Sequence, residues 1–142
     1  MNISARTEYA CIAVLELAAQ YNSKKPVRIR EIAAANGIPA RFLVQILLQL
    51  KSAGIVGSTR GAAGGYQLIR PPEEISLAEV MAVSEGQSSE PGSSLEQGTP
   101  ASRCLLETWK NVAAVESEML AAVTFADLVE RARGQTENMY YI

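Results

Sequence analysis

The chain of 142 residues contains no histidine and only two cysteines. Without histidine, it lacks the commonest general base and the commonest protein ligand of zinc. Cys11 and Cys104 lie far apart in the sequence and suggest no disulfide framework. The Gly-rich stretch 61–65 lies between two strand candidates, not between a strand and a helix, so it is not a phosphate-binding loop. We therefore predict that the protein is not an enzyme.

The chain also has no apolar run as long as a helix that spans a bilayer, and its first residues lack the layout of a signal peptide. We therefore expect a cytoplasmic protein without a membrane partner. The length is enough for one domain with a hydrophobic core and an appendage.

The net charge of −2 conceals a division between two halves of the chain. Residues 1–70 hold nine Lys/Arg and three Asp/Glu, a charge of +6, and residues 71–142 hold four and twelve, a charge of −8. The basic half favours a polyanionic partner. Charges that merely solvate the surface are the alternative.

Residues 38–66 combine a helix pattern with a hairpin pattern. Pro39 suits a first helical position, apolar residues then recur at helical spacing, and Gly54 is a natural end. Residues 55–59 and 66–69 are short strand candidates on either side of the Gly-rich turn. The helix has an apolar face of Leu43, Ile46, Leu47 and Leu50 and a polar face of Arg41, Gln45, Gln49 and Ser52.

Two shorter helices are predicted before this stretch, over 7–21 and 30–36. A short strand over 27–29 is predicted to pair with the hairpin and complete its sheet, the wing. Cys11 falls within the first helix, where we interpret it as a small buried apolar residue. The order of helix, turn, helix and hairpin is that of a winged helix-turn-helix. Such a fold places its polar helix in the major groove of DNA, while Arg60 on the hairpin reaches phosphates or the minor groove. Arg28 and Arg30 are then candidates for phosphate contacts.

The second half predicts two further helices and one long one. Ser76 with Glu79 is a capping box for a helix over 77–83, and Thr124 with Asp127 starts a last helix through 132. Residues 84–100 have almost nothing to bury and predict a flexible loop, and the tail 133–142 is expected to be loose.

The long helix over 101–123 carries an apolar stripe that is too wide for a helix merely resting on a small domain. We therefore predict that a second copy covers it in a two-fold homodimer, and the alternative is a helix folded only onto its own chain. The predicted dimer-interface residues are Leu105, Trp109, Val112, Met119, Leu120 and Val123.

Several segments in register resemble one family of bacterial regulators. They include Tyr9-Ala10, Phe42-Leu43-Val44-Gln45, the wing Arg60-Gly61…Gly64-Gly65-Tyr66, and Cys104-Leu105…Trp109. These segments are similar to the Rrf-two family, which includes the iron–sulfur cluster regulator IscR and the nitric-oxide-sensitive repressor NsrR. The resemblance covers roughly residues 1–132. It implies a mainly α-helical, homodimeric transcription regulator with a three-helix core, a β-hairpin wing and a long C-terminal dimerisation helix.

The resemblance also implies which residues contact DNA. Base contacts carry over to Arg41, Phe42 and Gln45, and the wing contact to Arg60, with Gly61 and Tyr66 beside it. Gln45 can pair bidentately with adenine, and Arg41 can take guanine or a phosphate. Some members carry Glu beside that glutamine where this chain has Val44, so their target sequences cannot be copied to it.

The chain departs from the family pattern at the sensor. Cluster-binding members place three cysteines between the wing domain and the dimer helix, whereas only Cys104 stands here, at the position of the last one. Glu8 matches a position where some members supply an acidic ligand from the partner subunit. These two candidate metal ligands are too few for an iron–sulfur cluster, which takes four ligands, so we expect no cluster and no other cofactor. Cys104 is then either a small residue at a helix start or a redox-sensitive thiol.

The sequence thus predicts a sequence-specific DNA-binding regulator that acts as a homodimer on a palindromic site. We expect a DNA-binding domain over 1–83, the loop 84–100, a dimerisation region over 101–132 and the tail 133–142. The alternatives are a winged helix used for protein–protein assembly, and a thiol-based redox-sensing regulator that uses Cys104. An effector that controls DNA binding is left open.

Overall fold

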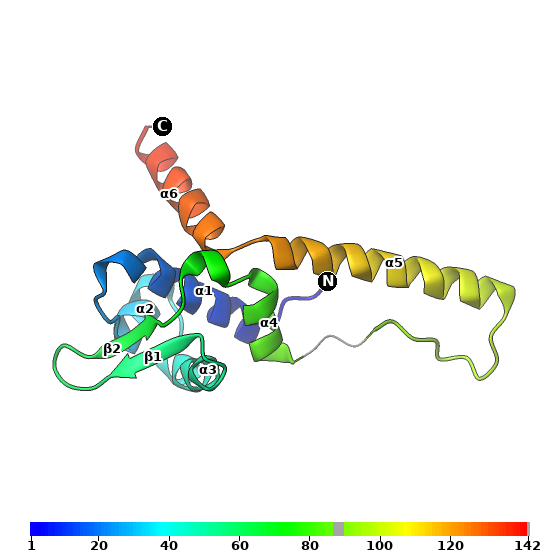
Figure 1. The fold of residues 1–142 in the computed structure, drawn as a ribbon, viewed down its shortest axis with the longest axis horizontal. Helices are drawn as coiled ribbons and strands as arrows, with labels where there is room; N and C mark the ends of the chain where they lie inside the picture. Colours follow the sequence, from blue (N-terminus) through cyan, green and yellow to red (C-terminus); the bar gives the residue numbers. More distant parts are fainter. Residues whose placement is uncertain (87–89, 142) are drawn as a thin grey trace.

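The computed structural model describes residues 1–86 and 90–141, and only the backbone of 137–141. The fold is mainly helical, with one antiparallel hairpin, and the predicted three-helix core with a β-hairpin wing is confirmed (Figure 1). The elements are α1 (Ala5–Ala19), the 3-10 turn η1 (Tyr21–Ser23), α2 (Ile29–Asn36), α3 (Ala40–Ser52), β1 (Val56–Thr59), β2 (Gly65–Leu68), the 3-10 turn η2 (Pro72–Glu74), α4 (Leu77–Glu85), α5 (Pro100–Ala122) and α6 (Phe125–Tyr141).

The first three helices share one apolar core. Ser4 caps α1, because its Oγ accepts a hydrogen bond from the Thr7 N–H, and the helix begins at Ala5, two residues earlier than predicted. Each helix buries one face and leaves the other in solvent, which is the arrangement that apolar residues at helical spacing predict. The buried side chains of this part are Ala10, Ala13, Val14, Leu17, Ile32, Leu43, Ile46, Leu47 and Leu50.

The wing is a two-stranded antiparallel hairpin in which Val56 lies opposite Leu68 and Thr59 opposite Gly65. The predicted third strand over 27–29 is wrong. Only Val27 pairs with the hairpin, through two hydrogen bonds of 2.8 Å with Tyr66, because Ile29 already begins α2. This single bridge still attaches the base of the wing to the segment before α2.

α4 is capped by Ser76 and begins at Leu77, as predicted. It extends two residues beyond the predicted end at 83, to Glu85. Only half of the predicted capping box forms. The Ser76 Oγ accepts the Glu79 N–H, but the Glu79 carboxylate pairs with Arg70. That ion pair ties the segment after β2 to α4.

The long helix α5 reaches away from the domain and is fixed to it at its C-terminal end (Figure 1). There, Leu77 N–H donates to Val123 O over 2.8 Å, and Phe125 N–H donates to Ile75 O over 3.0 Å. The 23 residues of α5 include none that are buried. Of the predicted loop 84–100, residues 87–89 lie outside the described residues, and 90–99 form neither helix nor strand.

The last helix differs most from its prediction. Thr124 and Asp127 form the expected capping box, but α6 then runs to Tyr141, so the prediction that the last helix ends at 132 is wrong. A cap at the first turn and the absence of proline allow the helix to continue through Gly134. Phe125 and Val129 enter the core of the first domain, so the start of α6 belongs to the same packing unit as α1.

Within the described ranges, no helix combines the length and the apolar character needed to cross a membrane.

Candidate nucleic-acid interface

The exposed face of α3 carries a row of polar side chains one turn apart. Arg41, Gln45 and Gln49 follow each other at four-residue intervals and are all exposed, while Leu43 and Leu47 on the opposite face are fully buried. Buried leucines fix how the helix is rotated about its axis, so the polar row must face outward. A helix presented in this way fits the major groove of B-form DNA.

Arg6 of α1 joins this row, although the sequence pattern did not single it out. Its Nη2–H donates to the Gln49 Oε1 over 2.6 Å. The only sequence signal was that Arg6 belongs to the basic half of the chain. Its position beside α3 follows from the packing of α1 against α3, which periodicity alone does not predict.

A hollow of about 480 Å³ lies between α1 and the start of α3. Phe42 stands in its wall with 44% of the residue exposed, and its ring centroid lies 6.0 Å from that of Tyr9. The Arg41 guanidinium lies 5.0 Å from the centroid of the Phe42 ring, a cation–π arrangement. Phe42 therefore supports Arg41 in addition to its predicted contact with DNA. The lining residues are Ala5, Arg6, Tyr9, Arg41, Phe42 and Gln45.

The wing carries Arg60 exposed, immediately before its turn. The turn needs glycine: Gly61 has φ of +101°, and a Cβ on Gly64 would lie 2.2 Å from the Thr59 carbonyl oxygen. The half-buried Tyr66 packs against the core, so here it holds the wing in place.

Lys51 at the end of α3 donates to the Ser58 Oγ in β1 over 2.7 Å. This contact, which the sequence did not predict, links the helix to the wing.

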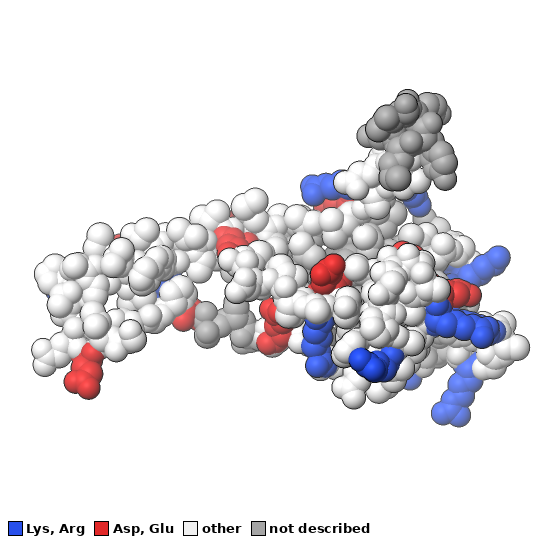
Figure 2. All heavy atoms as spheres, turned by 180° about the vertical axis from the view of Figure 1, so that it is seen from behind, with Lys and Arg blue, Asp and Glu red and all other residues white. Residues whose placement is uncertain are grey.

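Two other residues predicted to contact phosphates lie at the start of α2. Arg28 is the half-buried residue that precedes the helix, and Arg30 is exposed in its first turn. Figure 2 shows the Lys and Arg side chains gathered over the winged-helix end of the molecule, whereas Asp and Glu lie mainly along the remainder. Anionic DNA is therefore attracted to the end that carries α3 and the wing.

The apolar stripe of α5 is a second surface, at the other end of the molecule. Leu105, Trp109, Val112 and Met119 are exposed by 51 to 67%, and Val115, which the sequence pattern did not single out, by 56%. Leu120 and Val123 are half-buried.

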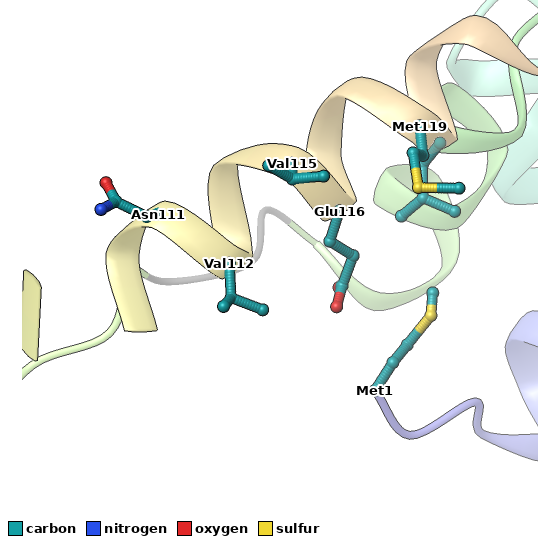
Figure 3. A pocket seen from close by; sticks show the side chains of 7 residues that line it. Met1, Asn111, Val112, Val115, Glu116 and Met119 are labelled. Atoms are coloured by element: carbon teal, nitrogen blue, oxygen red, sulfur yellow. The ribbon is translucent and has the colours of Figure 1, made fainter. Parts of the chain in front are cut away.

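Met1 lies below α5, and its side chain points toward the helix (Figure 3). The two enclose a hollow of about 540 Å³. Its other lining residues are Asn111, Val112, Val115, Glu116, Met119 and Leu120.

The two cysteines occupy contrasting environments. Cys11 packs against the core, and burial, with a smaller effect of the Glu85 charge, raises the pKa of its thiol to about 11. Cys104 is exposed on α5. Within residues 1–86 and 90–136, no three His, Cys, Asp or Glu side chains, Glu8 included, lie close enough together to hold a metal. This donor set does not fit an iron–sulfur cluster, which takes four ligands, mostly thiolates.

Comparisons with known proteins agree with this architecture. The model of the Rrf2 family, described as an iron-dependent transcriptional regulator, matches residues 3–131. The HTH-type transcriptional regulator CymR of Bacillus subtilis (strain 168) is 34% identical over 143 residues, which cover 100% of this chain and 100% of that protein.

Two further relatives point the same way. The HTH-type transcriptional regulator IscR of Aliivibrio salmonicida (strain LFI1238) is 30% identical over 131 residues, 91% of this chain and 77% of that protein. The solved structure of CymR, described as the global cysteine regulator of B. subtilis, superposes with a TM-score of 0.81 at 32% identity, covering 92% of this chain and 98% of that one. The chain therefore belongs to the Rrf2 family of DNA-binding transcriptional regulators.

Proposed function

We propose that the protein is a sequence-specific regulator that binds a palindromic DNA site as a homodimer. The observation that carries this proposal is the exposed polar row on α3, Arg41, Gln45 and Gln49, beside a wing tipped by Arg60. Glutamine and arginine are the side chains that pair with base edges in the major groove, and an arginine on a wing reaches the backbone or the minor groove. The row reads bases, and the wing, with Arg28 and Arg30, positions the protein on phosphates.

The dimer part of the proposal is supported by α5. Its Leu105, Trp109, Val112 and Met119 form a stripe that the described part of the chain leaves more than half exposed. Each buried apolar side chain contributes about 1.5–3 kcal/mol, so a second copy with the same stripe gains from association. Two copies related by a two-fold axis present two α3 helices to half-sites about one helical turn apart.

The proposal includes no catalytic step and no iron–sulfur cluster. The cysteines do not supply the thiolates for a cluster, and the whole chain has no histidine. Because bacterial DNA lies in the cytoplasm, the proposal implies a cytoplasmic protein. A redox role of Cys104 and control by an effector stay predictions.

The test is selection from a random duplex library with the purified protein, at low and at near-physiological salt. Enrichment of a palindrome is the expected result. Steep loss of affinity with salt accompanies it, because phosphate neutralisation releases counterions. Failure to bind any duplex at either salt would overturn the proposal and favour a protein–protein assembly module.

A further inference from the structure

One hydrogen bond crosses from α1 to the exposed row of α3. The Arg6 Nη2–H donates to the Gln49 Oε1 over 2.6 Å, between side chains 43 positions apart in the sequence. Gln45, one turn earlier on the same row, has no hydrogen bond to its amide group within residues 1–86 and 90–136. The two glutamines thus present the same side chain under different constraints.

The bond determines which end of the Gln49 amide faces outward. A guanidinium carries only donors, so the amide atom that meets Arg6 must be the oxygen, and the NH₂ group points away from it. We infer that Arg6 is a positioning residue for base recognition, which directs the Gln49 NH₂ into the major groove to select a base edge with acceptors. This inference rests on the proposed function.

Base chemistry then distinguishes Gln49 from Gln45. Guanine presents two adjacent acceptors, N7 and O6, in the major groove, whereas adenine presents its N7 acceptor beside the N6–H₂ donor. Bidentate recognition of adenine needs the oxygen and the NH₂ of one amide to face the base together. The Gln49 oxygen is engaged by Arg6, whereas Gln45 is free to present both groups. Gln49 therefore favours guanine, and Gln45 favours adenine.

The element that carries Arg6 is held firmly enough for this role. Ser4 caps α1 at Thr7, and the Thr7 Oγ1, on a residue with only 1% exposure, lies 2.9 Å from the Ser84 Oγ of α4. The Ser4 N–H donates to the Glu85 carboxylate over 3.3 Å. The first turn of α1 is thus fixed to α4, and a side chain on a fixed element positions its neighbour better than one on a loose arm.

The experiment compares base preferences selected by the wild type and by Arg6→Met, Gln49→Ala, Gln45→Ala and the double variant Arg6→Met/Gln49→Ala. Gln49→Ala identifies the base pair that Gln49 reads, because its preference is lost there. At that pair, the wild type is expected to favour G·C over A·T by about tenfold. Arg6→Met should reduce the ratio to about twofold while the Gln45 base pair keeps its preference, since the freed amide can rotate.

Two controls accompany the selection. Arg6→Lys, which also has only donors, should restore part of the preference that Arg6→Met loses. The double variant should have the same base preference as Gln49→Ala alone, because the Gln49 amide that Arg6 positions is already gone. Arg6 is exposed, so we expect all variants to melt near the wild-type temperature.

The inference is overturned if Arg6→Met weakens binding equally for all sequences with every preference intact, since Arg6 would then be a phosphate contact. It is also overturned if the wild type prefers an A·T pair at the position that Gln49 reads. In both cases the wild type still enriches a palindrome, and the proposed function stands. A wild type that enriches no sequence overturns the proposed function and this inference together.

Discussion

The helices α3 and α5 are both amphipathic, but they place their apolar sides oppositely. α3 buries Leu43, Ile46, Leu47 and Leu50 in the core and turns its polar row to solvent. α5 buries none of its 23 residues and leaves Trp109 and Met119 exposed by 53 and 67%. An apolar face that is already covered stabilises the fold, whereas one that is uncovered indicates a partner. The contrast supports the proposal that the first helix binds DNA and that a second copy of the chain covers the other.

The largest expected effect is the difference in reactivity between Cys11, on the covered side of α1, and Cys104, on the uncovered α5. Cys11 is half-buried against the core with its pKa raised to about 11, so about one thiol in a thousand is ionised near pH 8. The thiolate is the reactive form, and Cys104 on α5 is exposed. We expect an alkylating reagent to modify Cys104 at least about a hundredfold faster than Cys11, measured by mass spectrometry. Comparable rates in the native protein, with Cys104→Ser as control, would contradict the buried assignment of Cys11.

The covered face of α3 is tested by Leu47→Ala. Leu47 is fully buried, so its truncation should lower the free energy of unfolding by about 2–5 kcal/mol, measured by denaturant titration. The neighbouring Leu48 is 53% exposed, and Leu48→Ala should change the free energy of unfolding by only about 0.5 kcal/mol. Equal losses from the two variants would mean that α3 is not oriented as described.

The uncovered face of α5 is tested by Trp109→Glu. A charge in the centre of the stripe should convert the proposed dimer into monomers in sedimentation experiments. Affinity for a duplex with two half-sites should fall about 100-fold, because the two α3 helices no longer bind together. Lys110→Glu introduces the same charge one residue away, outside the stripe, and should leave the dimer intact. If the Trp109→Glu variant stayed dimeric, the stripe of α5 would not be the dimer interface.

The smallest expected effect is that of Arg60→Ala on the wing. Arg60 is proposed to contact the backbone, so its loss should weaken all duplexes by about the same factor, roughly tenfold at most. The slope of log affinity against log salt should fall by about 1. Arg103→Ala on α5 serves as the control, because it removes the same charge far from the wing. A changed base preference in Arg60→Ala would mean that the wing reads sequence.

Much of the candidate site was predictable because its signals are local. The helical spacing of apolar residues is sufficient to place Arg41, Gln45 and Gln49 on one exposed face. Glycine at 61 and 64 marked the wing turn, since a side chain would strain the backbone at 61 and clash with the Thr59 carbonyl at 64. The ends of elements were less accurate, as at α1 and α6, because caps and packing decide where a helix stops.

The amino-acid sequence by itself determined the winged helix-turn-helix order, the polar row of α3, the apolar stripe of α5 and the division of charge, since these depend on periodicity and composition. Tertiary structure alone decided which distant residues meet. It placed Arg6 against Gln49, Tyr9 against Phe42, and Phe125 of α6 in the core beneath α1. The reason is physical: periodicity identifies which face of a helix is buried, but the neighbour across that face depends on how all the helices pack together.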